Sequence, residues 1–131
     1  MILVKSTLGP SAIHGIGLFA EEPIKEGTKV WEFAPGFDLA VTKEEVEKLS
    51  EPAREDFFNY AYLSKHTGRY ILCSDDARFF NHDPDANTTC HIPAGKEMED
   101  ALVCHATRDI QAGEELTNNY GEFDEDPYDV V

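Results

Sequence analysis

The order of hydrophobic and polar positions along the chain predicts many short strands. Residues 2–5 and 16–20 look like strands on either side of a Gly-rich turn, and residues 28–33 look like another. After a turn at 66–68, four further segments have the composition of strands: 69–73, 88–92, 101–105 and 114–117. The polar residues 93–100 join two of these and predict an exposed hairpin loop.

Two helices are predicted near the middle of the chain. Thr42 and Glu45 have the spacing of a capping box, which predicts a short helix ending near Leu49. Residues 50–52 then open a second helix, because proline is tolerated in a first turn. Its core-facing side is predicted from helical spacing to hold Ala53, Phe57 and Ala61, with Tyr60 beside them. The fold class predicted is therefore mainly β with a small helical insert at about 42–64.

Length and cysteine content limit the number of domains and the cellular compartment that can be expected. A chain of 131 residues and 14.7 kDa fits one domain. No apolar run approaches the ~20 residues that span a bilayer, so no membrane association is expected. Met1 to Lys5 lack the features of a secretory leader. Three widely spaced cysteines, an odd number, predict reduced thiols and an intracellular protein, cytoplasmic or, in a eukaryote, nuclear.

The charge balance favours a basic partner. Acidic residues number 26 against 11 basic ones, for a net charge of -15. Nucleic-acid binding is disfavoured, because phosphate contacts need a basic surface. An acidic field raises encounter rates with cationic peptides. The alternative, that acidity only keeps the protein soluble, stays open.

Three motifs then carry a resemblance. They read IHGIGLFA at 13–20, RFFNHDPDAN at 78–87 and GEELTNNYG at 113–121. In this order they resemble the signature of SET-domain protein lysine methyltransferases, which move a methyl group from S-adenosylmethionine to a lysine amine. The resemblance implies a β-clip-like fold of several small curved sheets, with a pseudoknot-like crossing of the two later motifs. It also implies a catalytic domain at 1–121. The acidic residues 122–131 after it are expected to form a short, loosely held tail.

The same resemblance implies where S-adenosylmethionine binds. The turn with paired glycines lets the backbone approach a ligand closely, although alone it would be read as an ordinary hairpin. An Asn-His pair offers polar groups that could bind adenine or ligand charges, or could lock the crossing itself. Asp83 stands where the family usually has serine. The cofactor-binding residues implied are His14, Gly15, Ile16, Gly17, Asn81, His82 and Phe123.

Tyr120 is the catalytic residue that the resemblance implies. The reaction needs a neutral amine, and a lysine with a pKa near ~10.4 requires about 4–5 kcal/mol to lose its proton at pH 7. A desolvating channel, a nearby sulfonium and a hydrogen bond between phenol and amine would lower that cost. The phenol would orient the nitrogen without acting as a general base.

The lysine channel is expected to be aromatic, because rings exclude water and attract methylammonium groups. Asn118 stands two positions before Tyr120, where many family members carry Phe or Tyr, and its smaller size would leave room for more than one methyl. Trp31 is expected to be packing. The candidate channel residues are Asn118, Tyr60, Tyr62, Tyr70 and Tyr128.

Metal binding is not expected. Cys90 and His91, like Cys104 and His105, are neighbours on predicted strands and point to opposite faces, which makes chelation of one ion by either pair unfavourable.

Two alternatives for the function remain. The first is a methyltransferase acting on a basic protein, histone-like or other; the second is a weakly catalytic module that binds basic peptides in an acidic groove. With no cysteine-rich segment after Tyr120, either Phe123 and Tyr128 cover the cofactor or a homodimer completes the site.

Overall fold

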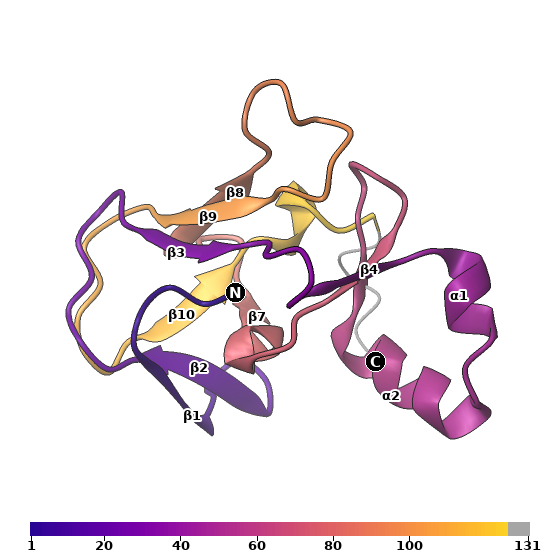
Figure 1. The fold of residues 1–131 in the computed structure, drawn as a ribbon. Coiled ribbons are helices and arrows are strands. Elements are labelled where there is room, and N and C mark those ends of the chain that lie inside the picture. Colours follow the sequence, from indigo (N-terminus) through magenta and orange to yellow (C-terminus); the bar gives the residue numbers. More distant parts are fainter. Residues whose placement is uncertain (126–131) are drawn as a thin grey trace.

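The computed structural model describes residues 1–125. Three small sheets and two α-helices form most of this part of the chain, which confirms the predicted mainly β class with a helical insert (Figure 1). The largest sheet has four strands in the order β1-β2-β10-β7. Their bounds are Ser6–Pro10 (β1), Ile16–Ala20 (β2), Asn81–His82 (β7) and Glu115–Asn118 (β10).

The other two sheets have three strands each. One has the order β3-β9-β8, with Lys29–Glu32 (β3), Thr88–His91 (β8) and Val103–Ala106 (β9). The β8–β9 connection is the predicted hairpin loop, and it projects from the body of the molecule (Figure 1). The last sheet has the order β4-β6-β5, with Leu39–Val41 (β4), Tyr62–Leu63 (β5) and Tyr70–Leu72 (β6).

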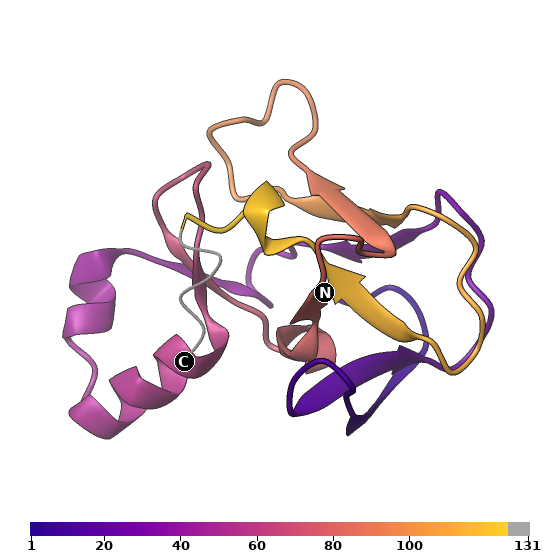
Figure 2. The same ribbon diagram turned by 180° about the vertical axis from the view of Figure 1, so that it is seen from behind.

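Both predicted helices form where their caps indicated. Helix α1 (Lys43–Glu47) has a complete capping box between Thr42 and Glu45. Helix α2 (Glu51–Tyr60) begins after Ser50, whose side chain accepts a hydrogen bond from Ala53 N. The two helices lie beside the β4-β6-β5 sheet, away from the other sheets, in both ribbon views (Figure 2). Neither is long and apolar enough to cross a membrane, nor is any other helix among residues 1–125.

The crossing of the two later motifs is present. Strand β10 pairs antiparallel with β2 and parallel with β7, so residues near 81 and 117 become neighbours. A reciprocal pair of hydrogen bonds strengthens this contact: Thr117 N donates to Asn87 Oδ1 (2.9 Å), and Asn87 N donates to Thr117 Oγ1 (3.1 Å). Both residues are buried. Satisfied polar groups therefore fix the crossing inside the core.

Two local predictions are wrong. The first strand runs over residues 6–10, while residues 2–5 contribute only an isolated bridge between Ile2 and Trp31. Ile2 and Val4 of this segment pack against the core, whereas Leu3 is exposed. On α2, Phe57 is the buried residue, whereas Ala53 and Tyr60 are exposed, because the helix touches the domain through one narrow side.

The prediction of three reduced cysteines is also wrong. Cys90 and Cys104 stand directly opposite each other on β8 and β9 and form a disulfide. Cys73 is free and buried. The pairing depends on strand register, which an odd cysteine count does not reveal. The disulfide lies within the apolar core that the three sheets enclose.

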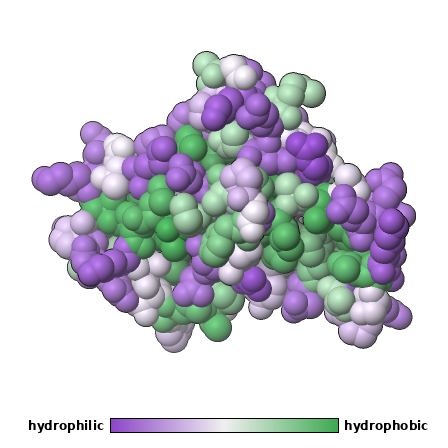
Figure 3. Space-filling model, viewed as in Figure 1, coloured by the Kyte–Doolittle hydropathy of each residue, from purple (hydrophilic) through white to green (hydrophobic). Residues whose placement is uncertain are grey.

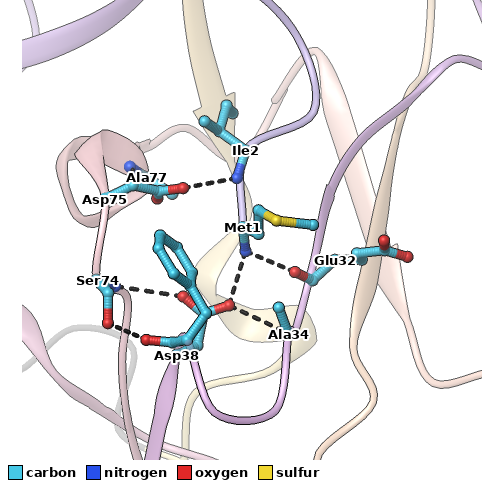
Figure 4. A network of polar contacts seen from close by, with 9 residues as sticks. Met1, Ile2, Glu32, Ala34, Asp38, Ser74, Asp75 and Ala77 are labelled. Atoms are coloured by element: carbon cyan, nitrogen blue, oxygen red, sulfur yellow. Dashed lines mark hydrogen bonds and ion pairs between the residues drawn. The ribbon is translucent and has the colours of Figure 1, made fainter.

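A buried carboxylate organises the centre of the molecule (Figure 4). The side chain of Asp38 is fully buried and binds the Met1 ammonium at 2.7 Å. It also accepts hydrogen bonds from Ala34 N (2.9 Å) and Ser74 N (3.2 Å). Nearby, Ile2 N donates to Asp75 (2.8 Å). The Asp38 carboxylate thus joins the segments around residues 1, 34 and 74, and these bonds compensate for its burial.

Residues 122–125 of the acidic segment are not loose. Phe123 is buried in the core, Ser64 forms a bridge with Asp124, and Glu125 N donates to Leu63 O (2.8 Å). The compact part of the chain therefore extends beyond residue 121.

Candidate functional site

A cavity of about 640 Å³ opens between the β1–β2 turn, the end of α2 and the crossing. Its volume is within the range of small-molecule sites. The rim is apolar and exposed, with Ile13 and Ile16 on one side and Phe58 and Tyr60 on the other. Apolar residues also gather across the middle of the face in Figure 3, while hydrophilic residues cover α1. The buried floor contains Trp31, Cys73, Leu102, Cys104 and Phe123.

The cavity brings together most of the residues that the sequence predicted. Ten of them line it: His14, Gly15, Ile16, Tyr60, Tyr62, Asn81, His82, Asn118, Tyr120 and Phe123. Gly17 and Tyr70 do not. Tyr128 lies outside the described residues. The two exceptions have clear structural reasons.

Gly17 does not line the cavity, and a neighbouring carboxylate occupies the space that a side chain at this position would need. A Cβ at this position would lie 2.5 Å from Glu115 Oε2 and 2.8 Å from its Cδ. Its backbone is not in the left-handed region, so the requirement for glycine here is one of space. Glu115 in turn accepts hydrogen bonds from Ser11 Oγ (2.7 Å). The glycine therefore lets a carboxylate bind the base of the β1–β2 turn.

Tyr70 belongs to a separate aromatic group. Its ring packs edge-on against Phe58 (5.3 Å between centroids) and Phe57 (6.2 Å). It fixes α2 to the β4-β6-β5 sheet and only indirectly shapes the cavity. Tyr60, by contrast, lies at the rim, where its ring contacts Phe79 (5.5 Å) and the Arg78 guanidinium (5.3 Å).

Asn81 uses its amide hydrogens on the protein. Its Nδ2 donates toward His14 O (3.1 Å), Ile16 O (3.2 Å) and Glu115 Oε2 (2.9 Å). These bonds hold the turn that forms one side of the cavity. Asn81 thus shapes this side of the cavity by fixing backbone, while its contact with a ligand stays a prediction.

His82 positions Tyr120. Its Nδ1 accepts a hydrogen bond from Tyr120 N (3.0 Å), and the two rings lie 5.2 Å apart. An accepting Nδ1 carries no proton, so a neutral His82 bears its hydrogen on Nε2. From the sequence, the two motifs were expected to lie close together, but the specific contact between His82 and Tyr120 was not predicted.

Tyr120 begins the 3₁₀ turn η2 (Tyr120–Glu122) and lies half-buried beside the cavity. Its hydroxyl donates to Phe80 O, the residue after the 3₁₀ turn η1 (Asp76–Phe79). Burial, followed by the nearby Asp124 and Glu115, raises the pKa of Tyr120 to about 12. The phenol therefore stays neutral at ordinary pH, and its oxygen presents lone pairs as acceptors.

The turn around Tyr120 is held from two sides. Lys65 Nζ donates to Gly121 O (2.5 Å). The Glu122 carboxylate accepts from Thr89 Oγ1 (2.7 Å) and from Cys90 N (3.0 Å). Strand β8, which contains the disulfide-bonded Cys90, is thereby linked to Glu122. Such anchoring reduces the freedom of the phenol to leave the cavity.

Phe123 and Tyr62 close the inner side. Their rings lie 4.8 Å apart, and Phe123 also lies 5.9 Å from the Tyr120 ring. Burial, with nearby Cys73 and acidic groups adding to it, raises the pKa of Tyr62 well above its usual value. Aromatic rings therefore line this side of the cavity.

Asn118 is buried and takes part in a polar chain. Its side-chain Oδ1 lies 2.8 Å from the Thr88 hydroxyl oxygen, which lies 2.6 Å from Thr117 O. Asp83 N donates to Asn118 O (3.0 Å) on the opposite side of the strand. Asp83 thus contributes backbone to the crossing.

Sequence reasoning missed several floor residues. Trp31, Cys73, Leu102 and Cys104 are apolar residues on or beside strands, and nothing local separates a cavity floor from ordinary core. Trp31 Nε1 is buried and has no hydrogen-bond partner among residues 1–125. That unpaired donor sets Trp31 apart from the other floor residues, but only the structure shows it.

The chain is similar to known proteins over most of its length. The model of the SET domain matches residues 15–121. The chain is 35% identical over 109 residues to the histone-lysine N-methyltransferase set9 of Aspergillus terreus, covering 83% of this chain and 16% of that protein. It is 26% identical over 124 residues to the human histone-lysine N-methyltransferase 2D, covering 94% and 2%.

The chain is also similar in fold to solved structures. The Chaetomium thermophilum Polycomb Repressive Complex 2 bound to GSK126 matches with a TM-score of 0.70 and 30% identity, over 95% of this chain and 17% of that one. A form of that complex in an autoinhibited conformation bound to S-adenosylmethionine matches with a TM-score of 0.63 and 27% identity, over 93% and 16%. The chain spans less than a fifth of each of these proteins.

Proposed function

Because the chain belongs to the SET domain family, we propose that it transfers a methyl group from S-adenosylmethionine to a lysine amine of a basic protein, histone-like or other. The observation that carries this proposal is one cavity lined by the β1–β2 turn, the Asn81–His82 strand and Tyr120. These segments are distant in sequence, and their convergence supplies a ligand site beside a neutral phenol.

The residues present fit the cofactor. The rim offers exposed backbone at His14, Gly15 and Ile16, held in place by Asn81. Phe123 adds an apolar surface. When bound, S-adenosylmethionine supplies an electrophilic methyl on a positive sulfonium. These residues would hold it through main-chain and apolar contacts.

Tyr120 would orient the substrate amine. Since its hydroxyl donates to Phe80 O, the phenol oxygen can accept a hydrogen bond from an amine N–H. That bond would aim the nitrogen lone pair without proton transfer to tyrosine. The aromatic side formed by Tyr62 and Phe123 would favour the neutral amine. Tyr60 and Tyr62 are the proposed channel aromatics, and Asn118 leaves room for more than one methyl.

The net charge of -15 would assist encounter with a cationic protein. Salt limits the interactions of exposed surface charges to about 8–10 Å at ordinary ionic strength, whereas interactions inside the closed cavity are screened less. Added salt should therefore raise KM more than it changes kcat. A response confined to kcat would count against electrostatic capture.

Radiolabelled methyl transfer to core histones tests the proposal, with Tyr120→Phe as the matched variant. We expect transfer to lysine by the wild type and a loss of about a hundredfold or more in Tyr120→Phe. Calorimetry with S-adenosylhomocysteine checks that the variant still binds the cofactor product. Binding without transfer to any protein in a cell lysate would favour the binding-module alternative.

A further inference from the structure

Strands β8 and β9 each carry a cysteine followed by a histidine. Cys90 and Cys104 stand directly opposite each other and are joined through their sulfurs in the core, so both point to the inner face of the strand pair. The next residue on each strand points to the other face. His91 and His105 therefore lie together on the outer face, although chelation between either histidine and the cysteine beside it stays unfavourable.

The two imidazole rings stack across the strands. Their centroids lie 5.5 Å apart, with 19° between the ring planes. The register places His91 opposite Val103 and His105 opposite Thr89, so the two histidines are diagonal neighbours, within reach of long side chains. His91 is exposed and His105 is partly exposed. Among residues 1–125, no hydrogen bond or ion pair involves either ring. The ring nitrogens can therefore bind a ligand from solvent.

The separation of the rings suits two imidazoles that bind one metal ion. With metal–nitrogen bonds of about 2.1 Å, each ring centre lies about 3 Å from the ion, and at bond angles of about 90–110° the two centres lie about 4.5–5 Å apart. The observed 5.5 Å is only slightly larger. Rotation about the Cβ–Cγ bond turns the ring edge and leaves the ring centre nearly in place, and this torsion is soft in histidine. Two nitrogens can thus converge on one ion without a change in the strands.

We propose that His91 and His105 form a surface site for a divalent transition-metal ion, copper or zinc. Imidazole is a ligand that both ions favour, whereas calcium and magnesium prefer oxygen. Residues 1–125 contain no group of three or more side chains that could hold a metal, so water completes the coordination. The site is open and binds copper more tightly than zinc, following the general order of affinities.

The site is separate from the cavity, since neither histidine lines it. Its test therefore needs neither substrate nor cofactor and does not depend on the proposed function. The disulfide between Cys90 and Cys104 fixes the two strands in register on the inner face. The histidines are therefore close together before the metal arrives, and such preorganisation lowers the cost of binding.

Copper binding tests the site in protein that carries no affinity tag. Paramagnetic resonance of the one-to-one complex at pH 7.5 should show coupling to two imidazole nitrogens. His91→Gln and His105→Gln should each leave one nitrogen and weaken copper binding about tenfold or more in competition with a chelator, because one arm of the chelate is lost. His14→Gln is the matched control: His14 is exposed on a different turn, and its substitution should change the affinity less than twofold. Equal losses in all three variants, or no saturable copper binding, would overturn the proposal.

A zinc titration followed by nuclear magnetic resonance gives a second readout, without any substitution. In ¹⁵N-labelled protein, zinc should shift one ring nitrogen of His91 and one of His105 together. The ring nitrogens of His14 and His66 should stay unchanged until far more zinc is present, and calcium or magnesium should shift none of them. Shifts spread alike over every histidine would mean nonspecific binding and would refute the site, as would a shift of one member of the pair alone.

Discussion

The Asn81 amide donates to the Glu115 carboxylate at 2.9 Å, and that carboxylate occupies the space where a side chain at Gly17 would begin. Ser11 binds the same carboxylate. The β1–β2 turn beside the cavity is therefore shaped by an acid on β10, about a hundred positions later in the chain.

Gly17→Ala should disturb this contact. The carboxylate can move away from a new Cβ only by giving up its bonds to Ser11 and Asn81, so we expect a loss of about 1–3 kcal/mol in unfolding free energy. Binding of S-adenosylhomocysteine should weaken about tenfold, because the turn loses its support. Urea unfolding and calorimetry measure the two effects. Gly9→Ala is the control, since a Cβ there would make ordinary contact with Phe19 at 3.4 Å. Equal effects of the two substitutions would refute the steric account.

The parts of the fold that local chemistry determines could be predicted. The caps at Thr42 and Ser50 set both helix starts, and the strands near 88, 103 and 115 lie in the segments that were predicted to be strands. Strand β5 was missed because two residues give no period to detect, and the stretch around it reads as helical. The first strand was misplaced because its sequence is largely polar and exposed.

The site was predicted less completely, because its roles depend on contacts between distant segments. The motif indicated Gly17 as a cofactor residue, whereas its neighbour in space is Glu115. The aromatic character of Tyr70 suggested a channel, but only packing shows that it faces Phe58. The cysteine pair followed from register, which no spacing rule contains.

The Tyr120 phenol should make stability fall at high pH. Burial raises its folded-state pKa to about 12, while in the unfolded chain it is near 10. From pH 10 upward the unfolded chain loses a proton that the folded chain keeps, so this contribution is complete below pH 10 and is lost as pH rises through 12. At pH 11 the wild type should have lost about 1 kcal/mol more than Tyr120→Phe. Urea unfolding at pH 9 and pH 11 measures the difference. Parallel losses in both proteins would show that Tyr120 titrates normally.

Thiol counting should distinguish the three cysteines. Under denaturing, non-reducing conditions we expect one reactive thiol per chain, Cys73, and three after reduction. In the native protein Cys73 should react very slowly, because burial raises its pKa to about 12 and leaves about one thiolate in ten thousand at pH 8. Three thiols in the unreduced, denatured chain would contradict the disulfide. Cys73→Ala should then give none before reduction.

Trp31 offers a direct optical test of cavity occupancy. It is the single tryptophan of the chain, it is 4% exposed, and it lines the cavity floor. Its emission should therefore be that of a buried indole, poorly quenched by acrylamide, and should change in intensity or wavelength when S-adenosylhomocysteine binds. The midpoint of that change should match the calorimetric Kd. Tyr70→Phe is the matched control, because Tyr70 lies outside the cavity and its substitution should leave the response intact. Calorimetric binding with no change at Trp31 would mean that the ligand occupies another surface, and the assignment of this cavity would have to be abandoned.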